Sequence, residues 1–274
     1  MTKKSDAPAI RFKGFSDAWE QRKLGEIGSV SMCRRIFKEQ TSETGDIPFY
    51  KIGTFGADPD AFISRELFEE YKSKYPYPQK GDILISASGS IGRTVEFAGN
   101  NEYFQDSNIV WLNHDERLSN PFLKCFYSVV KWAGIEGSTI KRLYNDNILN
   151  TVICMPSVPE QKRIGLFFEN LDNLITLHQR KFEKLTNVKK SMLEKKWIAP
   201  LIESIHKLPD TVIDSLVSKI QALQNKYATT FFEVEQQISE TEATLSGMIE
   251  DLEGNEYDML GLNELKKLLG GSAE

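Results

Sequence analysis

Basic and amide side chains gather in polar segments at residues 34–38, 105–108 and 141–145, and small polar residues gather at 81–93. Side chains of Arg, Lys, Asn and Gln pair with base edges, whereas Ser, Thr and backbone N–H groups hold phosphates. Each segment taken alone also has the composition of a solvated loop. Together they predict nucleic-acid contacts through Arg34, Arg35, Lys38, Ser88, Ser90, Arg93, Gln105, Asn108, Lys141, Arg142, Tyr144 and Asn145.

Two fragments partly resemble enzyme motifs, but neither has all the residues that its motif requires. The glycine-rich segment 81–93 lacks the Gly-Lys-Ser/Thr ending of a phosphate-binding loop, and its glycines do not open a helix. Residues 94–97 follow with a strand composition, so we predict a strand–turn–strand hairpin with a small polar tip, which can also be purely structural. Residues 120–122, Asn-Pro-Phe, have one proline where the amino-methyltransferase motif has two, and no glycine-rich cofactor motif precedes them.

The histidines and cysteines are few and scattered. Their spacing fits neither a metal site, nor a Ser–His–acid arrangement, nor a disulfide framework. We therefore expect no catalytic residue and no metal site among Cys33, Cys125, Cys154, His114, His178 and His206.

Charge is divided unevenly along the chain, whose formal net charge is −5 at pH 7. Residues 201–274 hold 14 acidic and 5 basic side chains, a net of −9, while residues 1–200 hold 25 acidic and 29 basic side chains, a net of +4. A phosphate backbone attracts a basic surface and repels an acidic one. We therefore expect DNA contacts in the first part of the chain and protein contacts in the last.

Short apolar runs rich in β-branched and aromatic residues recur through residues 1–156, separated by Gly, Pro, Asn and Asp, as strands require. Two helices are expected to interrupt them, near 64–73 and 121–132, the second with Pro121 at a first helical position. The pattern predicts a mixed α/β (α+β) domain with strands at 47–52, 83–86, 94–97, 109–112 and 152–155.

A long helix is predicted over residues 160–197, which contain one glycine and no proline. Apolar residues follow a heptad spacing along it, and at 1.5 Å per residue it would extend about 55 Å, too far for the interior of a compact domain. A histidine within such a stripe usually fixes the register of pairing rather than binding a ligand. We predict a coiled-coil arm that binds a partner through Ile164, Phe168, Leu171, Ile175, His178, Phe182 and Leu185.

A second heptad helix is predicted over 211–252, after a break that contains Pro200 and Pro209. Gly254 is expected to end it, and a short helix near 262–269 to follow. The two long helices suggest an antiparallel pair within the chain, and packing with other chains is an equal alternative. The predicted division is a globular domain at 1–156, a helical arm at 157–197, a linker at 198–210 and an acidic helical segment at 211–274.

No apolar run approaches the ~20 residues that span a bilayer. The basic residues at the start of the chain are not followed by the apolar stretch of a secretory signal. We therefore expect a cytoplasmic protein without a membrane partner.

Three passages, taken in one order, resemble the specificity (S) subunits of Type I restriction–modification systems. They are the opening at 8–26, the segment 81–92 and the passage 156–193, which begins Pro-Ser-Val-Pro-Glu-Gln-Lys-Arg-Ile. Each passage alone is weak support for this resemblance, whereas their combination in this order across residues 8–197 is specific to the family.

The resemblance implies a target-recognition domain at residues 1–156 that reads a few base pairs of double-stranded DNA, followed by a helix that docks methyltransferase (M) subunits. In this family the M subunits bind S-adenosylmethionine and methylate adenine. Restriction (R) subunits use ATP and Mg to translocate and cleave DNA. The chain itself would then be non-catalytic and bind no cofactor.

The sequence departs from the family in having one recognition domain where a full subunit has two, so it resembles a half-length form. No second copy of the opening at 19–26 follows Trp197, and the resemblance does not place residues 201–274. Two copies could pair as a homodimer through the apolar stripe of 160–197 and read a palindromic bipartite site. Alternatively, the helix at 211–252 could cover that stripe within one chain.

Three other functions stay open at the level of sequence. A coiled-coil interaction protein without a DNA role is favoured by the acidic segment and opposed by the basic loops, and it would show no salt-dependent DNA affinity. An inhibitory form would bind M subunits without supporting modification. An enzyme acting alone is the least supported.

Overall fold

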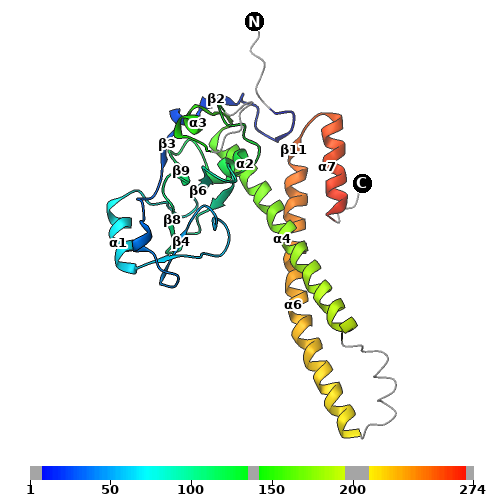
Figure 1. The fold of residues 1–274 in the computed structure, drawn as a ribbon. Coiled ribbons are helices and arrows are strands. Elements are labelled where there is room, and N and C mark those ends of the chain that lie inside the picture. The colour runs from blue at the N-terminus through cyan, green and yellow to red at the C-terminus, as the bar shows by residue number, and fades with distance from the viewer. Residues whose placement is uncertain (1–7, 135–141, 195–209, 270–274) are drawn as a thin grey trace. The chain divides into compact units, whose positions relative to one another are not determined.

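The computed structural model describes residues 8–134, 142–194 and 210–269. The chain forms two compact units (Figure 1). The first comprises Met1–Pro8 and Gly14–Leu166, and the second comprises Ala9–Lys13 and Phe167–Glu274. Strands and short helices make up the first unit, and long helices dominate the second. The predicted fold class, a mixed α/β domain followed by coiled-coil-type helices, is confirmed.

The first unit is built on a four-stranded antiparallel sheet in the order β3-β9-β6-β7. Its members are β3 (Gly28–Ser31), β9 (Ile109–His114), β6 (Ile83–Ser86) and β7 (Thr94–Glu96). Ile83 pairs with Glu96 and Ile85 with Thr94, so β6 and β7 form the hairpin that the sequence predicts.

The strands β6 and β9 have uninterrupted apolar runs because the sheet is buried on both faces. Ile83 and Ile85 pack in one hydrophobic cluster with helix α2 (Asn120–Val129), whereas Leu84 between them packs in a second cluster. Helix α1 and a three-stranded sheet close the second cluster. Their bounds are α1 (Arg65–Lys74), β5 (Phe62–Ile63), β4 (Ile47–Tyr50) and β8 (Tyr103–Phe104).

The sequence locates α1 and α2 to within a few residues. Helix α1 begins after Ser64, whose side chain accepts a hydrogen bond from the Leu67 N–H at 3.2 Å. Helix α2 ends at Val129, three residues before the predicted end. The sequence does not predict α3 (Asn145–Asn150), or the antiparallel pairing of β2 (Glu20–Lys23) with β10 (Val152–Met155).

Helix α4 (Val158–Glu194) begins in the first unit, where the buried side chain of Gln161 fixes its first turn. The Gln161 amide accepts from the Ser119 N–H at 2.8 Å and donates to the carbonyls of Arg117 and Pro156, both at 2.9 Å. This one side chain therefore joins the start of α4 to the loop that precedes α2.

Gly165 lies one turn further along α4, where the helix packs closely against the start of α2. A Cβ at this position would overlap the Pro121 Cβ and lie 3.0 Å from the Pro121 carbonyl carbon. The single glycine of the predicted helix is therefore required by packing.

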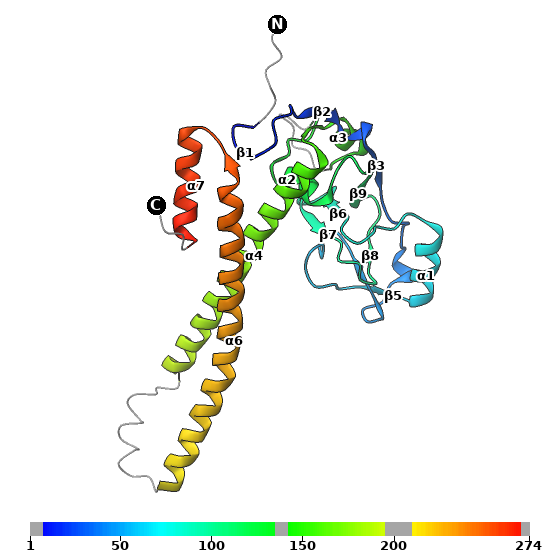
Figure 2. The same ribbon diagram turned by 180° about the vertical axis from the view of Figure 1, so that it is seen from behind.

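In the second unit α4 runs antiparallel to α6 (Asp210–Glu250), side by side in both views (Figures 1 and 2). Lys181 pairs with Glu235 at 2.9 Å, and His178 lies 3.6 Å from Glu242. The apolar residues buried in this unit include Phe167, Leu174, Leu177, Val234, Ile238, Leu245 and Ile249. Of the two alternatives left open by the sequence, the structure shows pairing within the chain.

The buried face of α4 is not the stripe predicted from the sequence. Leu174 and Leu177 are 6% and 9% exposed, whereas Phe168 and Ile175 of the predicted stripe are 47% and 55% exposed. Both sets of residues have heptad spacing, so spacing alone does not choose between them. Helix α4 therefore has one apolar stripe covered within the chain and a second, containing the predicted Phe168 and Ile175, that is exposed, and the binding of a partner by this second stripe stays a prediction.

The N-terminal strand β1 (Arg11–Phe12) belongs to the second unit, where it pairs antiparallel with β11 (Leu252–Glu253). The Lys13 N–H donates to the Asp251 carbonyl at 2.6 Å, and Lys13 Nζ donates to the Glu250 carbonyl at 2.8 Å. These bonds satisfy carbonyls that the end of α6 leaves without helical partners.

Two predictions about the C-terminal part need correction. Helix α6 ends at Glu250, because β11 follows directly, so Gly254 does not terminate it. Helix α7 (Glu256–Leu268) begins earlier than the short helix predicted near 262–269.

No helix within the described residues is long and apolar enough to cross a membrane. The predicted linker at 198–210 lies almost wholly outside the described residues. The division of the chain into four intervals stays a prediction.

Candidate nucleic-acid interface

Polar segments that are distant in sequence meet beside the end of β6 and the start of β9. The Ser88 hydroxyl, in the tip of the hairpin, donates to Asn108 Oδ1 at 2.9 Å. Ser88 also forms an isolated antiparallel bridge with Arg142. The Arg142 guanidinium in turn donates to the Ser107 carbonyl at 3.1 Å. The structure thus brings together three of the segments predicted to contact nucleic acid.

The segment after β3 joins the same face through its arginines. Arg35 Nε lies 2.8 Å from a carboxylate oxygen of Asp106, which belongs to the loop before β9. The Arg34 guanidinium lies over the Tyr75 ring, 5.2 Å from its centroid, a cation–π contact. All four polar segments therefore contribute to one surface, which we call the recognition face.

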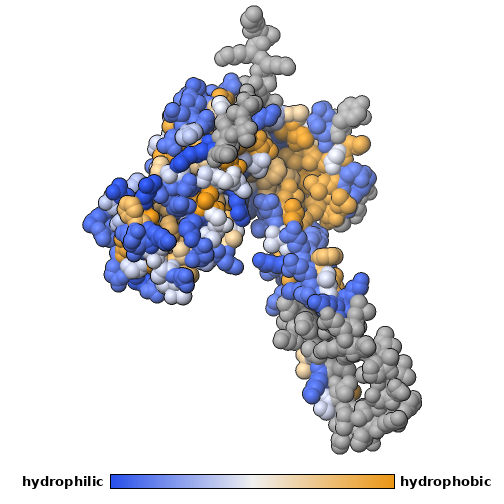
Figure 3. Space-filling view, viewed as in Figure 1, coloured by the Kyte–Doolittle hydropathy of each residue, from blue (hydrophilic) through white to orange (hydrophobic). Residues whose placement is uncertain are grey.

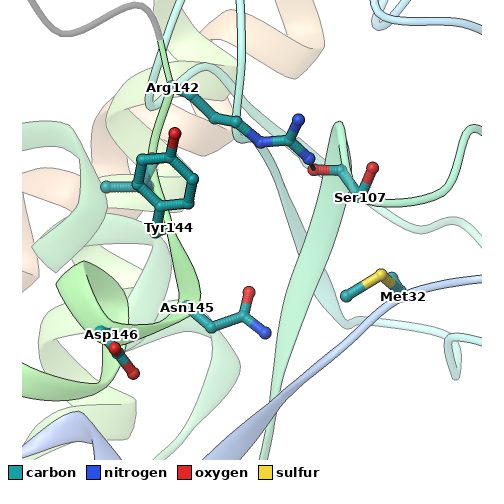
Figure 4. Close-up of a pocket in the computed structure, with 7 residues that line it drawn as sticks. Met32, Ser107, Arg142, Tyr144, Asn145 and Asp146 are labelled. Carbon is teal, nitrogen blue, oxygen red and sulfur yellow. Dashed lines mark hydrogen bonds between the residues drawn. The ribbon is translucent and has the colours of Figure 1, made fainter.

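A pocket of about 340 Å³ opens in this face (Figure 4). It is lined by Met32, Ser107, Arg142, Leu143, Tyr144, Asn145 and Asp146. A second pocket, of about 470 Å³, is lined by Met32, Cys33, Arg34, Arg35, Phe37, Tyr75, Pro76 and Asp106. Met32 lines both, so the two pockets lie next to each other on this face.

Ser107 has an unusual backbone conformation at the edge of the first pocket. Its φ is +49°, and it is the one non-glycine residue with positive φ in the described part of the chain. A residue with a Cβ adopts this left-handed conformation at an energetic cost, and such strain concentrates at functional sites. Here the strained residue supplies the carbonyl that receives Arg142.

The side chains of two predicted contact residues, Gln105 and Arg93, form hydrogen bonds with the protein backbone. Gln105 Oε1 accepts from the Ile52 N–H at 2.9 Å, and the Arg93 guanidinium donates to the Gly56 carbonyl at 3.3 Å. Both side chains therefore hold the loop after β4 against the rest of the face. Their contact with nucleic acid stays a prediction.

The remaining predicted contacts are exposed side chains. Tyr144 is 62% exposed, with the Arg142 guanidinium 6.0 Å from its ring centroid. Lys38 begins a short 3-10 helix, and Ser90 lies in the hairpin tip. Lys141 lies outside the described residues.

Cys33, which precedes the two arginines, is buried, and burial raises the pKa of its thiol to about 12. The thiol is therefore neutral at pH 7 and packs in the second hydrophobic cluster. No group of three or more His, Cys, Asp or Glu side chains within the described ranges could hold a metal ion. What the face offers is recognition by charge and hydrogen bonds.

Sequence reasoning did not single out Met32, Phe37, Tyr75 or Ser107, which are among the lining residues. Ser107 lies inside the polar segment 105–108, which was a usable indication. The other three have neutral side chains, and their place in the pockets becomes visible only when the segments fold together.

The residues predicted to bind a partner on α4 differ in their surroundings. Ile164 is half-buried and packs against the first hydrophobic cluster, and its contact with a partner stays a prediction. Leu171 is half-buried, and His178 lies near Glu242 in the helix pair. The other four, which we call the outer stripe, are exposed along α4: Phe168, Ile175, Phe182 and Leu185.

The chain matches the family model of the Type I restriction modification DNA specificity domain over residues 16–187. A protein of Haemophilus influenzae (strain KW20), described as the putative type I restriction enzyme specificity subunit S.HindORF215P, is 61% identical over 157 residues. That match covers 56% of this chain and 41% of the relative, so the chain spans less than half of the relative's length.

Solved structures show a weaker likeness. The HsdS subunit from Thermoanaerobacter tengcongensis has 18% identity and a TM-score of 0.45, with 68% of this chain and 47% of that chain covered. The S subunit of a Type-I restriction-modification system from M. genitalium has 17% identity and a TM-score of 0.42, with 71% and 50% covered.

The matched range contains the four polar segments of the recognition face and most of α4, and it is more than half of the chain. The chain therefore belongs to the Type I restriction–modification DNA specificity domain family, as the sequence resemblance implies.

Proposed function

We propose that the first unit reads a short sequence of double-stranded DNA as the specificity component of a Type I restriction–modification complex. The observation that carries this proposal is the convergence of the four polar segments, with Arg34, Arg35 and Arg142, on one hollowed face. Basic side chains would set the register by contacting phosphates, and side chains in the pockets would read base edges.

In this proposal M subunits dock on the outer stripe of α4. Exposed apolar side chains gathered along one face mark protein interfaces, and α6 covers the neighbouring stripe of α4 rather than this one. Adenine methylation and DNA cleavage belong to the M and R subunits, which bind S-adenosylmethionine, Mg and ATP. The chain itself is non-catalytic and acts with them in the cytoplasm.

The pairing of α4 with α6 bears on how many copies assemble. Two copies that paired through the face containing Leu174 and Leu177 would first have to displace α6. We therefore propose that each chain reads one half-site. A second copy in the complex would be held by M subunits rather than by a homodimer contact through this face.

The test is co-expression of the chain with the M subunit of its own system, followed by genome-wide mapping of methylated adenines. The matched control is a chain with Arg34, Arg35 and Arg142 all replaced by Ala. We expect a defined motif with the native chain and its loss with the control. A palindromic bipartite motif would mean that two copies assemble. A complex that forms but methylates no motif would overturn the DNA-reading proposal.

The second candidate is an inhibitory interaction protein that binds M subunits without reading DNA. Apolar surface on the second unit favours it: Leu260 and Leu268 on α7 are 66% and 82% exposed, and Figure 3 shows an apolar area over this helix and its neighbour. This candidate predicts M-subunit binding without salt-dependent DNA affinity. A DNA reader should instead bind far more weakly when salt rises from about 50 to 200 mM.

A further inference from the structure

Asn145 differs from the amide side chains of Gln105 and Asn108 on the recognition face, because those two form hydrogen bonds within the fold. Asn108 is bonded to Ser88, and Gln105 is bonded to Ile52. The Asn145 side chain is exposed and lines the first pocket, and no described residue forms a hydrogen bond with it. Within the described part of the chain, its donor and its acceptor are both left for a ligand.

The backbone around Asn145 is fixed on its N-terminal side. The Tyr144 N–H donates to Asn147 Oδ1 at 3.0 Å. Leu143 is buried, and its N–H donates to the Ala87 carbonyl at 2.7 Å. A backbone fixed in this way need not be ordered when the side chain binds, which favours affinity.

The other side of the pocket is apolar at Met32. Figure 4 shows the Met32 thioether and the Asn145 amide facing the same opening, while the Asp146 carboxylate is turned away. Arg142, tied to the Ser107 carbonyl, borders the opening. Among the polar groups of the pocket, the Asn145 amide thus offers a donor and an acceptor side by side, across the opening from the apolar Met32.

We propose that Asn145 is the base-reading residue of this pocket and that the base it reads is an adenine. The inference rests on the proposed function. In the major groove adenine presents the N7 acceptor and the N6 amino donor, which an asparagine amide complements, and the paired thymine presents a methyl group. The Asn145 NH₂ donates to N7, Oδ1 accepts from N6, and Met32 contacts the methyl group. Arg142 and Ser107 are positioning residues.

The test compares the methylation motif of the complex, formed from the full chain and its M subunits, between wild type, Asn145→Ala and Asn145→Asp. Asn145→Ala should reduce discrimination at one adenine position by roughly 5- to 150-fold and leave the other positions unchanged. Asn145→Asp exchanges the donor for an acceptor. Preference at that position should then shift toward cytosine, whose N4 amino group donates.

Asn101→Ala is the matched control. Asn101 is exposed in the turn after β7, at the opposite end of that strand from the hairpin tip. This variant should keep the wild-type motif at every position. Because Asn145 and Asn101 are both exposed, all variants should melt close to wild type, so a change of motif reports recognition and not folding.

Two results would overturn the inference. One is a motif that stays unchanged at every position in Asn145→Ala. The other is an equal loss of affinity for all sequences, which marks a phosphate contact instead of a base contact. A wild-type complex that methylates no motif would instead overturn the proposed function, so the two failures can be told apart.

Discussion

Gln161 is the buried polar side chain on which the junction between α2 and α4 depends. Its amide bonds to one backbone N–H and two carbonyl groups, from Ser119, Arg117 and Pro156. The net gain from each such bond is modest, but a buried group left without its partner costs about 1–3 kcal/mol. Loss of the Gln161 side chain would therefore destabilise the fold mainly because the backbone groups of Ser119, Arg117 and Pro156 would lose their hydrogen-bond partner.

Gln161→Ala should lower the free energy of unfolding by at least about 2 kcal/mol, because several buried groups lose their partner together. Urea unfolding of the purified chain measures this. Gln179→Ala, an exposed position on the same helix, should change stability by no more than about 0.5 kcal/mol. Equal stability of the two variants would contradict a structural role for Gln161.

Lys38 tests the other kind of contact on the recognition face. Its side chain is exposed beside Arg34 and Arg35, where we expect it to meet a phosphate. Lys38→Ala should weaken binding to all sequences alike and reduce the slope of log affinity against log salt by about 1. Salt titrations with the methylated motif and with a scrambled duplex measure this. Loss of discrimination at a single base pair would speak against a phosphate contact.

The residue types predicted the polar members of the recognition face but not their separate roles. Arginines and amides are recognisable in any loop, so Arg34, Arg142 and Asn145 could be named from the sequence. Which amide is tied down and which is open depends on loops that meet only in the fold, as Gln105 does with Ile52. Ser107 matters through its backbone, which its residue type does not reveal.

Helices and strands could be predicted from the sequence where their apolar residues follow one clear pattern. The apolar runs of β6 and β9 identify strands buried on both faces, whereas β2 reads Glu-Gln-Arg-Lys and has no apolar residue to reveal it. Helix α4 was predicted as a helix, and the sequence named the apolar stripe that is exposed but not the one that α6 covers. The covered stripe also contains Lys181, so hydrophobicity alone does not reveal it.

Replacement of glycine by alanine should have opposite effects on stability at Gly165 in α4 and at Gly247 in α6. Gly165→Ala places a Cβ against Pro121 and should lower the free energy of unfolding by about 1–3 kcal/mol. Gly247→Ala, in α6, meets open space and should raise it by up to about 1 kcal/mol, because alanine favours the helix. Urea unfolding followed by circular dichroism compares them. A stabilising effect at both positions would refute the close contact between α4 and α2.

At the scale of the whole molecule, the proposed assembly can be tested independently of the proposed recognition, because the outer stripe and the recognition face lie in different units. Phe182→Asp, in the outer stripe, should abolish co-purification with the M subunit because it places a charge in an apolar interface. Phe232→Asp, on α6, is the matched control, since the two side chains are 71% and 69% exposed. Pull-down of the tagged chain measures both. Equal binding by the two variants would remove the outer stripe as the docking surface.

The pairing of β1 with β11 makes the second unit from two separate stretches, Ala9–Lys13 and Phe167–Glu274. Gly14–Leu166 is therefore inserted into the helical unit, as a cassette with two junctions, and not simply joined to its front. A cassette of this kind can be exchanged for another of different sequence while the strand pair and the helix pair stay as they are. Under the proposed function, such an exchange would give a lineage a new DNA target without rebuilding the surface on which its partners assemble.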